Sequence, residues 1–177
     1  MTPLPEQPIS PLDGRYRSAV SAIGEHLSEA GLNRARVHVE VEWLIYLTDH
    51  ELFGSKRLDP EQTRRLRELA TGFGQHEIDE LARLEATTRH DVKAVEYLVR
   101  ARLAELGLGG IAELTHFACT SEDINNLSYA LTIRAAVRDL WLPRLNEVVA
   151  ALRAWAIEHR DAAMLAHTHG QPATPTT

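Results

Sequence analysis

A nearly continuous helical pattern from about Ser121 to Arg160 sets the strongest limit on how this chain can fold. Some forty residues at roughly 1.5 Å each give a helix of about 60 Å, longer than helices in compact domains usually are. Apolar side chains recur along one face of this segment: Ile124, Leu127, Leu131, Val137, Leu140, Leu145, Val148, Leu152 and Trp155. Too few other helices remain to cover that stripe. We therefore expect a helix bundle completed by residues beyond this chain, by other subunits, or by both.

The remaining sequence also has a helical period. Pro143 should bend or break the long helix. Four earlier helical segments are predicted: residues 18–31, ending at a left-handed Gly31; a segment reaching about Phe53; residues 60–88, with a candidate break at 72–74; and residues 91–107. The expected inward positions are Val37, Val41, Leu44, Ile45 and Leu52, then Val92, Val95, Leu98, Val99 and Leu103. Asp59-Pro60 and Asp91 are the predicted N-caps, and Gly107 the predicted end.

No alternating strand pattern, repeat or low-complexity tract is visible, so the predicted fold class is all-α. Residues 1–17, with four prolines and a Pro11–Gly14 turn, should form an irregular arm. The Gly107–Gly110 stretch is the best candidate boundary. We therefore expect an N-terminal helical domain over residues 1–110, and the beginning of a truncated central helix bundle over 111–177.

Composition excludes several classes of protein. With 177 residues, 44% of them hydrophobic, the chain can bury a core. Its 25 acidic against 19 basic residues argue against a nucleic-acid or anionic-membrane surface. Cys119 is the single cysteine, so no intramolecular disulfide can form. The first residues lack a signal-peptide pattern and no apolar run reaches membrane-spanning length, so we expect a cytoplasmic protein.

The segment from Thr168 to Thr177, THGQPATPTT, has the character of an active site. His169 is followed by a glycine, flanked by hydroxyl groups and succeeded by two prolines, a way to hold one imidazole in a polar pocket for proton transfer. Because terminal residues are usually dispensable, such chemistry here indicates part of a longer enzyme.

Thr120-Ser121-Glu122-Asp123 opens the long helix with a capping pattern. The segment is either an N-cap alone or a place where hydroxyl groups and free amides hold a substrate carboxylate or phosphate. Asn125 and Asn126, one turn later, suit an amide-lined polar pocket. Cys119 is expected to be a small buried residue, because nothing around it would activate a thiolate.

Four further groups carry polar side chains that could serve a site. Arg89, His90 and Asp91 could bind an anion and cap a helix, or be a solvated surface cap. Arg15-Tyr16 could meet a phosphate and a base, or simply be exposed. His116 could be a core histidine with satisfied hydrogen bonds. His167-x-His169 has no further ligands at a familiar metal-site spacing, so no metal site is predicted.

Four motifs together resemble one family. They are SPLDGRY (10–16), TRHDVKAVEY (88–97), HFACTSEDINN (116–126) and THGQPATP (168–175). They are similar, in order and over nearly the whole chain, to bacterial-type adenylosuccinate lyases of the aspartase/fumarase superfamily. The resemblance implies an all-helical, cofactor-free homotetramer that eliminates fumarate from adenylosuccinate and from the succinyl-carboxamide ribotide of purine biosynthesis. It also implies active sites built from several subunits.

The resemblance also implies roles for single residues. His169 would be the general acid that protonates the departing nitrogen, and Thr168 and Gln171 would contact substrate beside it. Thr120 and Ser121 would hold a succinyl carboxylate. Arg15 and Tyr16 would meet the nucleotide. The site near the nucleotide and leaving group would be lined by Arg89, His90 and Asp91.

Two positions depart from the family pattern. Arg89 stands where Asn is expected, and His167 stands where Arg is expected, so His167 receives no role. The family's general base is a serine on a Gly-Ser-Ser loop, a segment that residues 1–177 do not contain. The chain alone should therefore not turn over substrate. The alternatives are another fumarate-forming lyase of the superfamily, or a non-catalytic helical scaffold.

Overall fold

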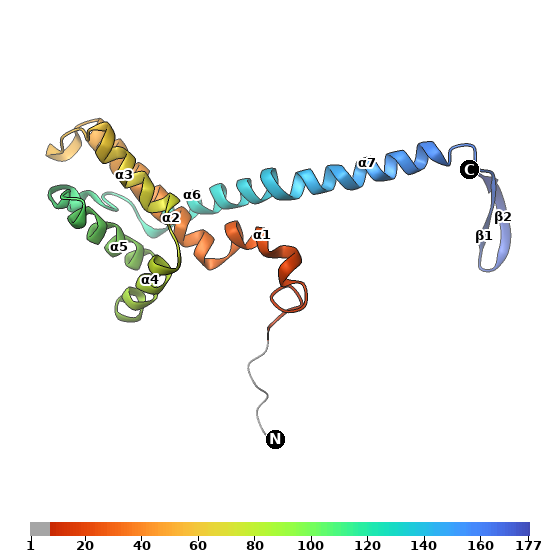
Figure 1. Ribbon diagram of the computed structural model, residues 1–177, viewed down its shortest axis with the longest axis horizontal. Coiled ribbons are helices and arrows are strands. Elements are labelled where there is room, and N and C mark those ends of the chain that lie inside the picture. Colours follow the sequence, from red (N-terminus) through yellow and green to blue (C-terminus); the bar gives the residue numbers. More distant parts are fainter. Residues whose placement is uncertain (1–7) are drawn as a thin grey trace, which may run out of the picture. The chain divides into compact units, whose positions relative to one another are not determined.

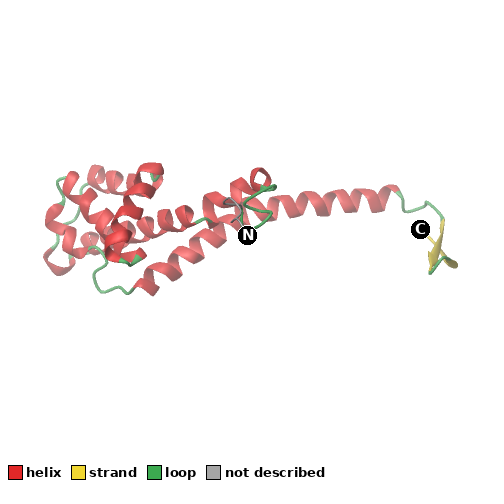
Figure 2. Cartoon of the chain, turned by 90° about the horizontal axis from the view of Figure 1, so that it is seen from below, coloured by secondary structure: helices red, strands yellow, loops and turns green. Residues whose placement is uncertain are grey.

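The computed structural model describes residues 8–177, and helices dominate it (Figures 1 and 2). The first elements are α1 (Arg17–Leu27), α2 (Glu29–Asp49), η1 (Leu52–Gly54), α3 (Pro60–Thr71), α4 (Gln75–Thr88) and α5 (Asp91–Glu105). They are followed by η2 (Gly109–Leu114), α6 (Ser121–Ala135), η3 (Ala136–Trp141), α7 (Leu142–Glu158), β1 (Met164–Thr168) and β2 (Gln171–Thr176). The all-α prediction is confirmed for the bulk of the described residues. The start of the predicted arm, residues 1–7, lies outside them.

Two compact units divide the chain, one ending at Ala136 and the other beginning at Val137. The domain boundary predicted near Gly107–Gly110 concerns the whole protein and stays a prediction. In the first unit, α2 is the central helix. It packs against α1, α3, α5 and α6, while α4 lies along α5 (Figure 1).

The core of the first unit lies between α2, α3, α4, α5 and η2. Its largest contributions are the predicted inward residues of α2 and α5, which are buried: Val37, Val41, Leu44, Ile45, Val95, Leu98, Val99 and Leu103. A smaller cluster joins Val39 of α2, Val92 of α5 and Ile124 of α6. The helical period therefore predicted the buried faces correctly. Leu52 is an exception, because α2 ends at Asp49 and Leu52 is exposed in η1.

The prediction that the first helix ends at Gly31 is wrong. α1 stops at Leu27, Ser28 caps α2 by accepting the Gly31 N–H at 3.1 Å, and Gly31 lies within the first turn of α2. The glycine serves a close approach instead. A β-carbon there would lie 2.6 Å from the carbonyl oxygen of His26. Glycine thus lets the two helices meet at a sharp junction.

Other predicted helix ends are confirmed. Asp59 caps α3 and shares a capping box with Gln62. Gly72 ends α3, and α4 begins after Gly74. Gly107, with a φ of 74°, follows the end of α5. The cap of α5 differs from the prediction, since His90 and not Asp91 occupies that position.

The long helical segment is present from Ser121 to Glu158 as α6, η3 and α7. η3 is a π-helical turn directly before Pro143, whose missing N–H and bulky ring disturb the preceding turn, so the predicted irregularity is confirmed. Of the predicted stripe, Ile124 is buried. The more exposed members are Leu127, Leu131, Val137, Leu145, Val148, Leu152 and Trp155.

The second unit ends in a two-stranded antiparallel hairpin of β1 and β2 (Figure 2), so the expectation of no strands is wrong. Thr168 pairs with Gln171 across a two-residue turn of His169 and Gly170, both with positive φ, as a tight hairpin turn requires. The strands are almost wholly exposed, so they lack the apolar alternation by which strands are predicted.

Candidate functional site

Two predicted site segments meet where α5 and α6 begin. His90 caps α5, its Nδ1 accepting the Lys93 N–H at 3.2 Å. With that nitrogen as acceptor, the neutral ring carries its proton on Nε2, which lies 3.5 Å from the Ser121 Oγ. Ser121 is the first residue of α6. The structure therefore brings His90 and Ser121 together from positions 31 residues apart.

Thr120 precedes α6 at its cap position. Its N–H and its hydroxyl both donate to the Asp123 carboxylate, at 2.7 and 3.0 Å. The predicted capping role is thus confirmed, and these bonds lower the pKa of Asp123. Because the Thr120 hydroxyl proton is engaged here, Ser121 offers the freer hydroxyl group of the pair.

Arg89 and Asp91 flank His90 but differ in their contacts. Arg89 ends α4 in the left-handed region, with a φ of 53°, and its side chain is exposed. Asparagine tolerates that backbone better than arginine does, which gives a physical reason for the Asn that the family resemblance leads us to expect at this position. The carboxylate of Asp91 accepts the Val92 N–H at 2.9 Å and pairs with Arg36 at 2.6 Å.

The Asp91 carboxylate is held in its charged form. Burial acts to raise its pKa, but the Val92 N–H, the Arg36 guanidinium and His90 together outweigh burial and leave the pKa below its ordinary value. Arg36 was not singled out in the sequence. The available signal was a cation next to Val37 on the apolar face of a helix, where a charge must have partners.

The loop before α6 is anchored to α2. The His116 N–H donates to Glu40 Oε2 at 3.0 Å, and His116 Nδ1 lies 2.6 Å from Glu40 Oε1. Trp43 donates its indole N–H to the Phe117 carbonyl at 2.9 Å. His116 thus binds the buried Glu40 through its backbone and its ring, in agreement with the interpretation as a core histidine, and its side chain is 19% exposed. Burial raises the pKa of Glu40, against the lowering effect of His116.

That anchoring holds an unusual backbone. His116 and Ala118 have φ values of 60° and 59°, a left-handed conformation that costs non-glycine residues about 1–2 kcal/mol each. Cys119 lies at this loop beside an apolar groove of about 620 Å³ between α2 and α6. Burial, with the charges of Glu40 and Asp123, raises the pKa of the Cys119 thiol. Cys119 is only partly buried, so the prediction of a buried residue is wrong in degree, whereas the raised pKa agrees with the expectation that nothing activates the thiolate.

Asn125 and Asn126 behave differently. The buried Asn125 accepts the Arg36 Nε–H at 3.0 Å and donates to Glu122. The exposed Asn126 donates to the Glu122 carbonyl of its own helix at 2.8 Å. Asn125 thus belongs to a polar network beneath the start of α6, and Asn126 does not.

Arg15 and Tyr16 lie at the start of α1 and contact each other. The guanidinium of Arg15 is 5.2 Å from the centre of the Tyr16 ring. The preceding turn is closed by Asp13, which accepts the Ser10 N–H at 2.7 Å, so the predicted turn is confirmed. In the described part of the chain neither Arg15 nor Tyr16 hydrogen-bonds to His90 or Ser121, and both side chains are exposed.

His169, Thr168 and Gln171 share the hairpin of the second unit. His169 occupies the first turn position, with a φ of 49°, between Thr168 and Gln171. All three side chains are exposed. The described residues thus present the imidazole on a hairpin tip, and the polar pocket expected around it is not formed by its neighbours in this hairpin.

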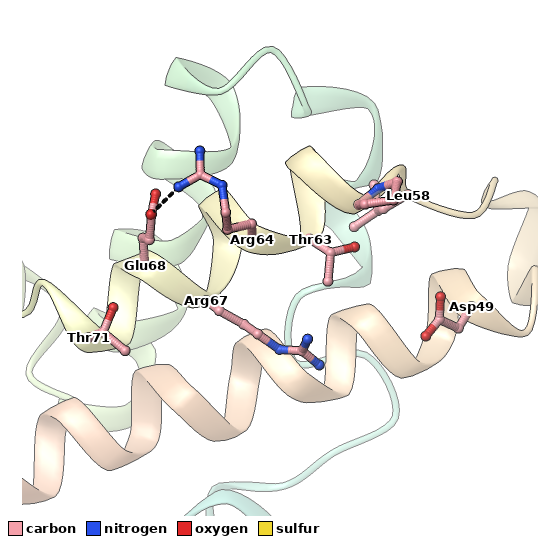
Figure 3. A pocket seen from close by; sticks show the side chains of 8 residues that line it. Asp49, Leu58, Thr63, Arg64, Arg67, Glu68 and Thr71 are labelled. Carbon is pink, nitrogen blue, oxygen red and sulfur yellow. Dashed lines mark hydrogen bonds and ion pairs between the residues drawn. The ribbon is translucent and has the colours of Figure 1, made fainter.

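A separate groove of about 520 Å³ lies between α2 and α3 (Figure 3). Arg64 and Arg67 dominate its polar lining, and each is paired: Arg64 with Glu61 and Glu68, Arg67 with Glu42 at 2.6 Å. The Arg67–Glu42 pair ties α3 to α2, whereas both Arg64 pairs lie within α3, and neither arginine is an unmatched cation. None of the predicted site residues lines this groove.

Within residues 8–177, no helix is both long enough and apolar enough to cross a membrane.

Comparison with known proteins identifies the family. The lyase family profile matches residues 14–177. Adenylosuccinate lyase of Escherichia coli K12 is 41% identical over 171 residues, covering 96% of this chain and 38% of the relative. The adenylosuccinate lyases of Legionella pneumophila Corby and Haemophilus influenzae are 40% and 38% identical, with the same coverage. The chain thus spans 38% of the length of these curated relatives. With a family match over nearly all of its residues, the chain belongs to the lyase family.

Proposed function

We propose that the whole protein is an adenylosuccinate lyase and that this chain is its N-terminal part. The observation that carries the proposal is identity of about 40% to adenylosuccinate lyases over 96% of the chain. The geometry supports it. His90 and Ser121 meet at the start of two helices, where free amides and the helix dipoles favour a bound carboxylate.

The reaction breaks a carbon–nitrogen bond. A base removes a proton from carbon, the electrons of that C–H bond form the double bond of fumarate, and the C–N electrons leave with nitrogen. His169 protonates this nitrogen, because an amine leaving group needs a proton and an imidazole can carry one near neutral pH. The base is supplied by a segment outside residues 1–177.

The other predicted residues bind substrate. Ser121, with Thr120 beside it, holds a succinyl carboxylate, and His90 with Asp91 lines the site near the leaving group. Arg15 and Tyr16 meet the nucleotide. The remaining contacts come from Arg89, Thr168 and Gln171. The exposed stripe of α7 supports a bundle shared by four subunits, in which α7 is covered. We place the enzyme in the cytoplasm, with no metal or organic cofactor, and keep the boundary near residue 110.

His169→Ala in the whole protein tests the proposal. Loss of a positioned general acid should lower turnover of adenylosuccinate by about 10²–10⁴-fold with a smaller effect on substrate binding. His167→Ala is the matched control, because His167 lies on the same hairpin and has no assigned role. Fumarate release is followed by absorbance.

Several outcomes would contradict the proposal. Near-native turnover by His169→Ala would remove this residue from the mechanism. Turnover of argininosuccinate or malate by the wild-type protein, with none of adenylosuccinate, would assign it to another lyase of the superfamily. Turnover by residues 1–177 alone would show that the base lies within this chain.

A further inference from the structure

Arg36 binds three elements of the first unit from a buried position. Only 4% of its surface is exposed. Its Nη2 donates to Asp91 Oδ2 at 2.6 Å, its Nε to Asn125 Oδ1 at 3.0 Å and its Nη1 to Asn33 Oδ1 at 2.8 Å. The acceptors belong to α5, α6 and α2. One planar guanidinium thus joins three helices.

Both distant acceptors lie at the helix starts that carry the candidate site. Asp91 directly follows His90, and Asn125 lies one turn after Ser121. The apolar cluster joining the same helices is small, with Val39, Val92 and Ile124 as its buried members. Apolar contacts have no preferred direction, whereas hydrogen bonds depend on both distance and angle. The directional bonds of Arg36 therefore connect the start of α5 to the start of α6.

We propose that Arg36 is a positioning residue, which holds His90 and Ser121 at their mutual distance by binding Asp91 and Asn125. Its effect on catalysis rests on the proposed lyase function, whereas its effect on the distance between His90 and Ser121 does not. Arg36 touches neither of those two residues in the hydrogen-bond network, so it acts through its acceptors.

Lysine cannot replace this arginine. An ammonium group is a point donor at the end of a flexible chain, whereas the three acceptors of Arg36 match the fixed fork of a guanidinium. Arg36→Lys keeps the charge and most of the volume but loses the hydrogen bond to at least one of the three helices. Arg102→Lys is the matched control. Arg102 is also largely buried and binds Glu77, Glu80 and Glu105, away from the candidate site.

The kinetic test is a double-mutant cycle in the whole protein. Arg36→Lys should lower kcat/KM for adenylosuccinate by about 10²-fold, the size of effect caused by misplacing reacting groups by about 1 Å. In a Ser121→Ala background the same substitution should cost much less, because the group it positions is gone. Arg102→Lys should lower thermal stability and leave kcat/KM unchanged.

A structural measurement separates this proposal from the proposed function. Crystal structures of the whole wild-type and Arg36→Lys proteins should show the separation of His90 Nε2 and Ser121 Oγ increased in the variant. If the enzyme proves inactive on adenylosuccinate, the proposed function fails and this measurement still decides the role of Arg36. Should Arg36→Lys not fold, Asn125→Ala removes the Arg36 bond to α6, together with the Asn125 bond to Glu122 within α6, and serves for both measurements. An unchanged separation, or equal losses of kcat/KM in both backgrounds, would overturn the proposal.

Discussion

Charged residues on the buried face of α2 connect its core to the residues of the candidate site. Arg36 and Glu40 lie one helical turn apart, and both are almost completely buried. Arg36 binds Asp91 in the first turn of α5 and Asn125 one turn into α6, while Glu40 binds the loop that leads into α6. A buried charge is tolerated only with full hydrogen bonding, so each of these residues ties its partner firmly.

Residue types at the candidate site were predictable, but their partners were not. Histidine, serine and threonine beside helix starts already indicate chemistry at His90, Thr120 and Ser121. The contacts of Arg36 and Glu40 span 55, 89 and 76 residues along the chain, and no local pattern encodes pairings at such separations. Arg36 therefore emerged only from the structure.

The binding residues can be tested apart from the general acid. In the whole protein, Arg15→Ala and Ser121→Ala should each weaken binding of a non-reacting substrate analogue by roughly 1.5–3 kcal/mol, since each removes a donor to an anionic group. Isothermal titration calorimetry would measure both dissociation constants. Arg17→Ala, two residues from Arg15 in the exposed first turn of α1, is the control. If neither dissociation constant changes, Arg15 is simply an exposed surface residue and Ser121 only part of a helix N-cap.

Asp91 should make stability depend on pH. Its folded-state pKa lies below that of an unfolded aspartate, about 3.9, so its ionised form stabilises the fold above that pH. This contribution is lost as the pH falls through the folded-state pKa. The unfolding free energies of wild type and Asp91→Asn, from urea titrations between about pH 6 and pH 2, should therefore converge in acid. A constant difference across that range would contradict the assignment.

Helix ends were predicted well where a cap has a local chemical signal. Asp59-Pro60 and Gly107 mark ends that the structure confirms. The Gly31 prediction was wrong because a glycine can serve close packing as well as a left-handed turn. The sequence did not predict the hairpin for two reasons. Its exposed strands contain Pro172 and Pro175, which are unusual in strands. Its turn is His-Gly, whereas the strong sequence signal for a two-residue hairpin turn is Asn-Gly.

Two glycines in adjacent helices should respond oppositely to alanine. Gly24, inside α1, has open space around its position, so Gly24→Ala should stabilise the chain by about 0.4–1 kcal/mol by restricting the unfolded state. At Gly31 a β-carbon would meet backbone oxygens of Glu25 and His26 at 2.8 and 2.6 Å, so Gly31→Ala should destabilise it by about 1–3 kcal/mol. Chemical denaturation measures both, and stabilisation by Gly31→Ala would show that the α1–α2 junction relaxes freely.

At the scale of the whole chain, the first unit has a packed helical core, whereas the apolar side chains of α7 are not packed against any helix of the described residues. The core residues of α2 and α5 have only a few per cent of their surface exposed, whereas α7 contains no buried residue. Sequence periodicity predicted both facts, because an amphipathic stripe reports that a partner is required. It does not identify that partner, since a stripe is satisfied equally by later helices of the same chain or by other subunits.

The uncovered stripe should make residues 1–177 associate in solution. Leu145, Val148, Leu152 and Trp155 are exposed on α7, and burying such side chains contributes about 1.5–3 kcal/mol each. Sedimentation velocity over a dilution series should show a molar mass that rises with concentration. A variant with Val148→Gln, Leu152→Gln and Trp155→Gln should stay monomeric over the same range. It should keep the stability of the first unit, because these side chains take no part in that core. If the wild-type chain is strictly monomeric at high concentration, the stripe needs partners that a second copy of this chain does not provide.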